Sequence, residues 1–434
     1  MKTIVIGSGG REHAIAFKLA SSSLVSDVYC VPGNGGTALE SKCHNITLKE
    51  GQSYADIARE YGCTLAVVGP EDPLSKGEAD LLWQSGISTV GPKKAAAQLE
   101  ASKDLAKSFM SKYHVASALS KTFTDAKEAL SYIEEKGAPI VIKADGLAAG
   151  KGVVVALTIE EARAAVKDMM EDGSLGQAGS KLVIEDYLRG SEISVLAAVS
   201  VTPELSKQGK SCIKPFLAAR DHKRLMDGAL GPNTGGMGAI CPVEDATEEV
   251  MAEFSKTILT PTLNGLVAEG YDYRGFIFFG LMLTKDGPKC LEYNVRLGDP
   301  ETQAVLPMMD CDFASLCQSI ADGSLIDFDL KWKSGYQVAP VAVSGGYPKA
   351  YEKGKKITID TKEVEASGAK IFIAGATEKD SCLYTSGGRV LACSAHGDTF
   401  DEAWKKSYLA LQSVSFDGMF YRRDIGLPGA AESK

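Results

Sequence analysis

The sequence lacks the features that mark several large classes of protein. Its longest apolar run, Phe276 to Leu283, is far too short to cross a membrane and indicates a buried strand. The net charge of −9 lacks the excess of Lys and Arg that general nucleic-acid binding requires. Few residues precede Gly7, so we expect no signal peptide. The ten cysteines include no CxxC pair, which predicts reduced core thiols in a cytoplasmic protein.

What is present is the composition of a soluble globular protein. The chain has 434 residues, of which 44% are hydrophobic and 24% are charged. This length predicts about three domains, each able to bury its own core. No internal repeat or low-complexity segment is visible.

The spacing of apolar runs changes along the chain. Strands and helices alternate in the first hundred residues, which predicts a doubly wound parallel sheet. We expect residues 95–113 to be helical, followed by closely spaced strands with a single helix at 159–170, typical of an antiparallel α+β module. A long helix over 247–269 precedes paired strands, and short strands with glycine turns follow residue 337. The expected fold class is therefore a multidomain α/β and α+β protein with a small β-rich C-terminal part.

The most informative segment is residues 142–153, which read IKADGLAAGKGV. Lys143 ends an apolar strand, and the loop after it contains Gly146, Gly150, Lys151 and Gly152 before another apolar run. Glycines let a backbone approach a ligand and turn its N–H groups outward, while ammonium groups neutralise phosphate. No GxxxxGK[ST] is present, and a strand follows the glycines. We therefore predict a strand-loop-strand lid over a polyphosphate; the alternative is an ordinary hairpin with a solvated Lys151.

Glycines also follow the first strand, where Gly9 and Gly10 precede Arg11 and Glu12. A dinucleotide fingerprint would need a third glycine where Glu12 stands and an acidic residue after the second strand. A single substrate phosphate fits better at this helix N-terminus. The loops that carry Asn34, Gly35 and Glu71 follow neighbouring strands and are further candidates, although all three segments could be simple strand-to-helix turns.

A third set of polar residues lies in the string LEYNVRLGDPE, which begins at residue 291. Period-two alternation on a strand would place Glu292, Asn294 and Arg296 on one face. A carboxylate and an amide oxygen are hard ligands suited to Mg²⁺, and an arginine can hold a carboxylate or phosphate. The alternative is a polar strand face in contact with solvent.

The polar run from Asp221 to Arg224 is followed by the glycine-rich string GPNTGGMG. Alone, the run could be a surface loop. Next to a second glycine-rich loop, Asp221 and Lys223 are more typical of a substrate pocket.

These residues together resemble a known family. The ATP-grasp pattern is matched in order and spacing by Lys103, Lys143, residues 146–152, the hinge Glu185-Asp186-Tyr187-Leu188, Glu192, Glu292 and Asn294. The phosphoribosylamine–glycine ligases, also called glycinamide ribonucleotide synthetases, are matched by IGSGGREHA, VGPEDPL, KADGLAAGKGV, DHKR, GPNTGGMGA, NVRLGDPETQ, GGYP and GGRVL. The resemblance extends from Ile4 to Gly426. One departure is Glu185-Asp186, where Glu-Glu is expected.

The resemblance implies a domain organisation and a reaction. It implies an N-terminal Rossmann-like domain at 1–102, an ATP-grasp domain at 103–330 with a nucleotide lid at about 122–190, and a C-terminal β-rich domain at 331–434. The reaction would join glycine to 5-phosphoribosylamine through a glycyl phosphate, with ATP and Mg²⁺ or Mn²⁺. The protein would be a cytoplasmic monomer whose partners are small molecules, not nucleic acid or membrane.

The resemblance also implies roles for the residues. ATP would be bound by Lys103, Lys143, Gly150, Lys151, Gly152, Glu185, Asp186, Tyr187, Leu188 and Glu192, and the metal by Glu292 and Asn294. Arg296, Asp221 and Lys223 would serve the reacting groups. The substrates would meet Gly9, Gly10, Arg11, Glu12, Asn34, Gly35, Glu71, Gly298 and Asp299.

Three other functions remain open. An NAD-dependent oxidoreductase would explain the N-terminal glycines but leaves the lysine-containing hairpin unused. A binding or scaffold protein without activity would need a substituted ligand position. Within the ATP-grasp class, biotin carboxylases, formate-dependent purine enzymes and other carboxylate–amine ligases are the nearest competitors.

Overall fold

The N-terminal part of the chain is a parallel sheet with helices beside it. The computed structural model describes residues 1–146, 152–173 and 175–430. The sheet has the order β3-β2-β1-β4-β5, and all of its pairs are parallel, as the alternating pattern predicted. Its elements are β1 (Lys2–Gly7), α1 (Gly10–Ala20), β2 (Asp27–Pro32), η1 (Thr37–Leu39), β3 (Cys43–Asn45), α2 (Tyr54–Tyr61), β4 (Leu65–Val68), α3 (Glu71–Lys76), α4 (Glu78–Gln84) and β5 (Ser88–Val90).

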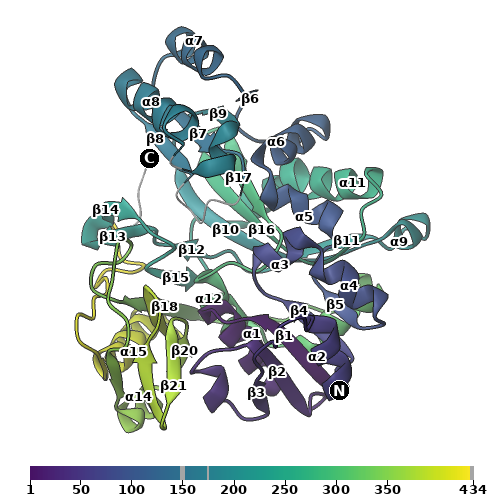
Figure 1. Cartoon of the computed structure of the whole chain (residues 1–434), viewed down its shortest axis with the longest axis vertical. Coiled ribbons are helices and arrows are strands. Elements are labelled where there is room, and N and C mark those ends of the chain that lie inside the picture. Colours follow the sequence, from purple (N-terminus) through teal and green to yellow (C-terminus); the bar gives the residue numbers. More distant parts are fainter. Residues whose placement is uncertain (147–151, 174, 431–434) are drawn as a thin grey trace.

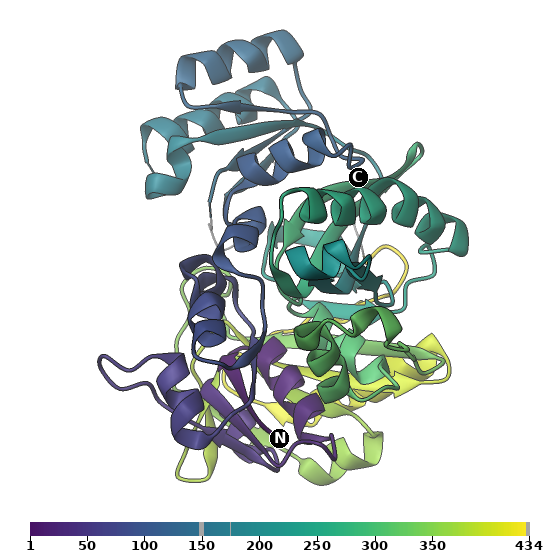
Figure 2. The same cartoon turned by 90° about the vertical axis from the view of Figure 1, so that its right-hand side faces the viewer.

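A small antiparallel module stands at the top of the molecule in Figures 1 and 2. Its strand order is β6-β9-β7-β8, and it has a hydrophobic core of its own. It consists of β6 (Ser120–Phe123), α7 (Ala126–Lys136), β7 (Ile140–Ala144), β8 (Val153–Ala156), α8 (Ile159–Val166), η2 (Lys167–Glu171), η3 (Gly176–Ser180) and β9 (Leu182–Asp186).

The glycine-rich loop joins two of these strands. β7 and β8 pair antiparallel, with Lys143 opposite Val153, so the predicted strand-loop-strand arrangement is confirmed. Gly150 and Lys151 lie outside the described residues.

The central sheet has the order β11-β10-β16-β17 and contains the two longest strands described, β10 and β16. Both are buried along most of their length, and β16 covers the expected apolar run. The elements of this region are α5 (Lys94–Ala101), α6 (Lys103–Lys112), β10 (Ser191–Val201), α9 (Pro203–Lys207), β11 (Cys212–Pro215), α10 (Glu248–Phe254), η5 (Ser255–Leu259), α11 (Thr260–Ala268), β16 (Tyr273–Thr284), β17 (Gly287–Asn294), α12 (Glu301–Met308), α13 (Phe313–Asp322) and η6 (Leu325–Asp327).

Two expected helices are interrupted. The helical segment expected over 95–113 forms as α5 and α6, which Ser102 separates because it is extended (φ −126°, ψ 115°). Its hydroxyl caps α6 by accepting a hydrogen bond from the Leu105 N–H at 3.1 Å. The expected helix over 247–269 contains a wider π-helical turn, η5, between α10 and α11. Pro261, which lacks an N–H, follows that turn.

The C-terminal part shares a sheet with the central part. This sheet has the order β12-β15-β18-β23-β20, so β15 pairs with β18 across about a hundred residues of sequence. Smaller sheets pair β13 with β14 and join β21, β22, β19 and β24. The elements are β12 (Arg220–Asp221), β13 (Arg224–Met226), η4 (Asp227–Ala229), β14 (Leu230–Asn233), β15 (Gly238–Cys241), β18 (Tyr336–Val343), β19 (Lys356–Ile359), α14 (Thr361–Ser367), β20 (Lys370–Ile373), β21 (Ala376–Lys379), β22 (Cys382–Thr385), β23 (Arg389–Gly397), α15 (Phe400–Gln412) and β24 (Val414–Ser415).

The expected fold class is confirmed, since a parallel sheet is followed by several antiparallel ones. All ten cysteines are free thiols, and seven of them are buried. Within the described part of the chain, no helix combines the length and the apolar character needed to span a membrane.

Candidate functional site

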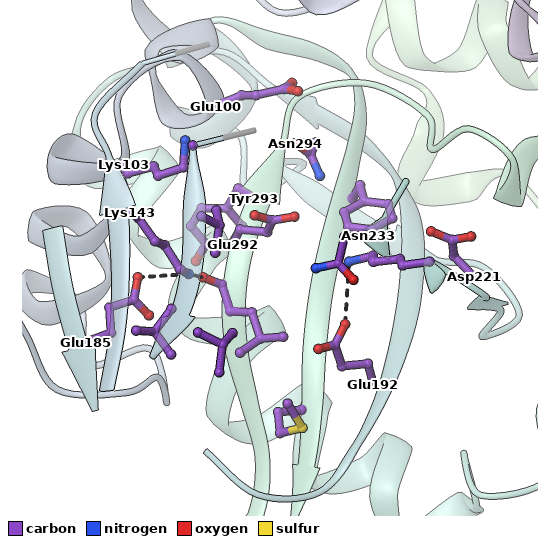
Figure 3. A pocket seen from close by; sticks show the side chains of 18 of the residues that line it. Glu100, Lys103, Lys143, Glu185, Glu192, Asp221, Asn233, Glu292, Tyr293 and Asn294 are labelled. Carbon is purple, nitrogen blue, oxygen red and sulfur yellow. Dashed lines mark hydrogen bonds and ion pairs between the residues drawn. The ribbon is translucent and has the colours of Figure 1, made fainter. Parts of the chain in front are cut away.

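One cavity of about 400 Å³ collects most of the predicted site residues. It lies between the small antiparallel module and the central sheet, and Figure 3 shows Glu185 and Asp221 at opposite sides of it. The predicted residues that line it are Glu71, Lys103, Lys143, Gly152, Glu185, Asp186, Tyr187, Leu188, Glu192, Asp221, Lys223, Glu292, Asn294, Arg296 and Asp299. Gly9, Gly10, Arg11, Glu12, Asn34, Gly35 and Gly298 are not among the described lining residues.

The hinge side of the cavity combines an apolar wall with a buried ion cluster. Val141 lies opposite Glu185 in the sheet, and both Val141 and Leu188 line the cavity. Glu185 forms ion pairs with Lys143 and Lys107, each at 2.8 Å. Burial would raise the pKa of Glu185, but the two ammonium groups outweigh it and lower that pKa. An apolar slot beside a fixed charged cluster suits a purine base joined to a polyphosphate.

Two lysines reach the position expected for phosphates. Lys103 is the first residue of α6, and its ammonium donates to the Gly146 carbonyl at 3.0 Å. Lys143, at the end of β7, also donates to the Leu291 carbonyl at 3.3 Å. Burial lowers the pKa of Lys103, while the negative charge of Glu292 opposes that shift. Lys143 already pairs with Glu185, and phosphate oxygens would be a further anionic partner for both lysines.

Glu292 and Asn294 lie on β17 and point into the cavity (Figure 3). Burial would raise the pKa of Glu292, but Lys223, Lys143 and Lys103 outweigh it and hold that pKa below its usual value. The side chain is therefore a carboxylate. Within the described ranges, no group of three His, Cys, Asp or Glu side chains could hold a metal by itself. One carboxylate and one amide oxygen fit Mg²⁺, which is usually held by few protein ligands together with substrate phosphates.

Arg296 lies beyond the end of β17, so the prediction that it shares the strand face with Glu292 and Asn294 was wrong. Two carboxylates hold its guanidinium. Glu100 accepts from Nη2 at 2.9 Å, and Glu71 lies 3.3 Å from Nε. Glu100 is only 6% exposed and also accepts the Val295 N–H, whereas Glu71 is 34% exposed. Glu71 is thus the partner that an incoming anion would displace more readily.

Asp221 and Lys223 occupy the side of the cavity away from the hinge. Lys223 lies 3.4 Å from Glu192, and that carboxylate raises the pKa of the lysine. Burial and the neighbouring carboxylate of Glu301 raise the pKa of Asp221 well above its usual value. One buried oxygen of Asp221, Oδ1, has no hydrogen-bond partner among the described residues. A polar ligand group at this position would satisfy it.

The N-terminal glycines make room for a side chain of the protein. Glu12 accepts the Gly9 N–H at 2.6 Å and pairs with Arg11 at 2.5 Å. A Cβ atom at Gly7, Gly9 or Gly69 would lie 2.2 to 2.7 Å from the Glu12 side chain. The Glu12 carboxylate thus stands at the helix N-terminus, where a substrate phosphate was expected. A phosphate contact by Gly9, Gly10, Arg11 or Glu12 stays a prediction.

Asn34 and Gly35 connect the N-terminal sheet to the C-terminal part. The Asn34 amide donates to the Ser8 and Ile373 carbonyls, each at 2.8 Å. Its oxygen accepts the Gly36 and Thr37 N–H groups, and the Gly35 N–H binds the Ala376 carbonyl. These polar groups already form hydrogen bonds with other groups of the protein, so a substrate contact by either residue also stays a prediction.

Sequence reasoning missed several residues at the cavity. Glu100, Lys107 and Glu301 line it and contact predicted site residues or exert charge on them. Of the residues that the structure describes, Arg389 does not line the cavity but pairs with Asp299, which does. Lys107 could have been found, because it lies one helical turn after Lys103 on the same helix. Glu301 ends the string LEYNVRLGDPE, two residues after Asp299, so that string could have indicated it. Glu100 and Arg389 have no comparable local pattern.

Known proteins of one family match this chain along its length. Family models described as the N domain, the ATP-grasp (A) domain and the C domain of phosphoribosylglycinamide synthetase match residues 1–100, 101–302 and 337–428. A phosphoribosylamine–glycine ligase of Clostridium acetobutylicum is 47% identical over 98% of this chain and 99% of its own length. One from Vibrio vulnificus is 42% identical over the full length of both chains.

Solved structures show the same fold. The crystal structure of phosphoribosylamine–glycine ligase from Thermotoga maritima has a TM-score of 0.83 and 36% identity, covering 98% of this chain and 100% of that one. The biotin carboxylase domain of Hydrogenobacter thermophilus 2-oxoglutarate carboxylase, solved with MgADP and bicarbonate, has a TM-score of 0.71 at 15% identity over 96% and 91% of the chains. That second likeness concerns the fold alone. The chain belongs to the phosphoribosylglycinamide synthetase family.

Proposed function

We propose that this chain is an ATP-dependent ligase that joins the carboxylate of glycine to the amine of 5-phosphoribosylamine. The products are glycinamide ribonucleotide, ADP and phosphate, as in de novo purine biosynthesis. Relatives named for this reaction match the whole chain at 42–47% identity. One observation carries the proposal. In a chain that matches these relatives, the lysines of the hinge side and the polar residues around Asp221 line one continuous cavity.

The reaction needs an activated acyl group, because a carboxylate oxygen is a poor leaving group. The γ-phosphoryl group of ATP passes to a glycine carboxylate oxygen and ADP leaves. The amine nitrogen then attacks the carbonyl carbon, the C–O bond to phosphate breaks, and the amine loses a proton. Positioning and charge neutralisation provide most of the catalysis in such steps, and no nucleophilic side chain is required.

The predicted site residues divide between the two halves of this reaction. Adenine binds at the hinge, which consists of Glu185, Asp186, Tyr187 and Leu188. The ribose binds to Glu192. The phosphates are bound by Lys103, Lys143, Gly150, Lys151 and Gly152. Arg296 steadies the glycine carboxylate or its phosphate. Arg296 lies 3.3 Å from Glu71, which is long for an ion pair, so a substrate anion can replace Glu71 as its partner.

The phosphoribosylamine half lies around Asp221, Lys223, Gly298 and Asp299, with Gly9 to Glu12, Asn34, Gly35 and Glu71 as the remaining candidates. Burial would raise the pKa of Asp299, but Arg389 and Arg11 lower it, so this carboxylate is charged. Arg389 contacts the Asp299 carboxylate at 3.3 Å and Arg11 pairs with Glu12, so both arginines are already bound within the protein and keep Asp299 ionised.

Glu292 and Asn294 would hold Mg²⁺, or Mn²⁺, against the phosphates of ATP. The metal would neutralise charge on those phosphates. Lys223, Lys143 and Lys103 keep Glu292 ionised, which is the state that a metal ligand needs.

The proposal extends to assembly, location and domain limits. We propose a monomer as the active unit. Ten free thiols support a cytoplasmic location. We retain boundaries near residues 102 and 330 and a nucleotide lid at about 122–190, of which β6 to β9 form the sheet.

The test is release of ADP with each substrate omitted in turn. ATP, Mg²⁺, glycine and phosphoribosylamine together should give sustained turnover, and omission of either organic substrate should abolish product. Equal ADP release with formate, bicarbonate or another amino acid in place of glycine would point to another ATP-grasp enzyme. Turnover of a nicotinamide cofactor, seen as an absorbance change at 340 nm, would point to an oxidoreductase instead.

A further inference from the structure

The C-terminal part holds a loop that forms the Asp221 side of the cavity. Asn233, Thr234 and Gly235 line the cavity there. The Gly235 N–H donates to the Tyr347 hydroxyl at 2.9 Å, and the Gly235 carbonyl accepts from Arg389 Nη1 at 2.6 Å. Both backbone polar groups of one glycine are therefore bound by side chains from beyond residue 340.

Arg389 also fixes Asp299. Its Nη1 donates to the Asp299 carbonyl at 2.9 Å, and its Nη2 lies 3.3 Å from the Asp299 carboxylate. The Arg389 side chain is 21% exposed. One guanidinium thus bridges the loop and Asp299, and its planar fork suits two acceptors better than an ammonium would.

A glycine makes room for one of these two side chains. Tyr347 lies in GGYP and Arg389 in GGRVL, the two strings for which the sequence offered no role. A Cβ atom at Gly388 would lie 2.3 Å from the Tyr347 ring, so this glycine is needed where Tyr347 packs. The segments before β19 and β23 are therefore built to meet each other beside the loop.

The loop in turn touches the predicted substrate residues. Gly236 has φ +116°, and a Cβ atom there would lie 2.6 Å from Asp221 Oδ1 and 2.4 Å from Pro300. The Thr234 hydroxyl donates to the Lys223 carbonyl at 2.8 Å. A shift of the loop would therefore move or release Asp221 and Lys223.

We propose that Tyr347 and Arg389 are positioning residues for the amine-transfer step, because they hold the 233–236 loop and Asp299 where phosphoribosylamine is bound. The inference rests on the proposed function. ATP takes the hinge side, so the second substrate has the side of Asp221, which lies opposite Glu185 in Figure 3. Asp299 also lines the cavity. The activation of glycine does not depend on this contact.

The test compares Tyr347→Phe with the matched control Tyr351→Phe. Tyr351 packs near the Tyr347 ring, with centroids 6.4 Å apart, on the same segment. Tyr347→Phe keeps the ring and removes only the hydroxyl that accepts the Gly235 N–H. The loss of one such hydrogen bond predicts a KM for phosphoribosylamine raised roughly fivefold to tenfold.

The activation half-reaction supplies the second readout. The rate at which glycyl hydroxamate forms from ATP, glycine and hydroxylamine should be the same in Tyr347→Phe and Arg389→Lys as in the unaltered protein. Arg389→Lys should raise the KM for phosphoribosylamine further and increase the ADP released per product, because less glycyl phosphate is captured by the amine. Circular dichroism and the thermal midpoint verify that each variant is folded.

Two results would overturn the inference. One is an unchanged KM for phosphoribosylamine in folded Tyr347→Phe and Arg389→Lys. The other is hydroxamate formation that falls in parallel with ligation, since that would indicate a general structural role. Absence of both hydroxamate and product in the unaltered protein would instead overturn the proposed function, and this inference with it.

Discussion

Three buried side chains at the hinge illustrate how charge is arranged around this cavity. Lys107 and Lys143 share the Glu185 carboxylate, and the side chains of all three are less than 10% exposed. A buried carboxylate that loses its partners is strongly destabilising, whereas the intact cluster contributes little net stability. We infer that the cluster serves to hold Lys143 in place at the phosphates rather than to stabilise the fold.

At the same scale, Glu292→Gln tests the metal proposal. The variant keeps the volume of the side chain but removes its anionic charge, so the Mg²⁺ concentration for half-maximal turnover should rise by about tenfold or more. Turnover at limiting Mg²⁺ should fall accordingly. Titration of activity with Mg²⁺ measures both.

The control for this variant is Glu204→Gln, which changes an exposed carboxylate of α9. It should leave the Mg²⁺ dependence unaltered. The same Mg²⁺ dependence in Glu292→Gln as in the unaltered chain would mean that the metal is bound elsewhere.

Individual side chains could be predicted from sequence only where local geometry determines them. Glu292 and Asn294 share a strand face because β17 includes both, and period two then places them together. Arg296 follows the end of that strand, and its partners Glu100 and Glu71 lie about 200 residues away. No local pattern reveals such pairs.

At the scale of elements, the start of α6 decides where Lys103 lies. Ser102 ends α5 and caps α6, and its hydroxyl also lies 3.3 Å from Asp145 at the start of the glycine-rich loop. The cap thus connects the helix that carries Lys103 to the loop that its ammonium contacts.

Ser102→Ala should therefore affect both stability and nucleotide binding. Loss of the cap predicts a decrease of about 1 kcal/mol in the free energy of unfolding. The KM for ATP should rise, because the first turn of α6 and its contact with Asp145 loosen together. Urea denaturation and initial rates at varied ATP are the measurements.

Thr247→Ala is the matched control, because Thr247 caps α10 by accepting the Val250 N–H. It should lose similar stability without a change in the KM for ATP. Equal effects of the two substitutions on that KM would show that the Ser102 cap has no special relation to the nucleotide.

Elements were predictable where apolar periodicity is strong. The parallel N-terminal sheet and the antiparallel β7–β8 pair follow from runs of apolar residues and from the glycines between them. The interruption at Ser102 was not predicted, because serine is tolerated inside helices and the residues on both sides favour helix.

At the scale of the whole molecule, three parts of the chain meet at Asp299. Arg389 approaches from the C-terminal part and Arg11 from the N-terminal helix α1, and both lower the pKa of Asp299. The pairing of β15 with β18 makes the central and C-terminal parts one continuous sheet. Neither feature could be predicted from composition or spacing, because each depends on how separate modules dock.

The proposed function places both reacting substrates in one cavity, so activation and capture of glycine can occur without release of the intermediate. The central claim is that glycine is activated as an acyl phosphate. Transfer of oxygen from the glycine carboxylate to phosphate is the direct consequence of that route, since the C–O bond that breaks lies on the carbonyl side of the bridging oxygen.

The decisive measurement uses glycine labelled with oxygen-18 in its carboxylate, with ATP, Mg²⁺ and phosphoribosylamine. Mass spectrometry of the released phosphate should find one labelled oxygen for each glycinamide ribonucleotide formed. Unlabelled phosphate, with product still formed in equal amount, would contradict the glycyl phosphate route.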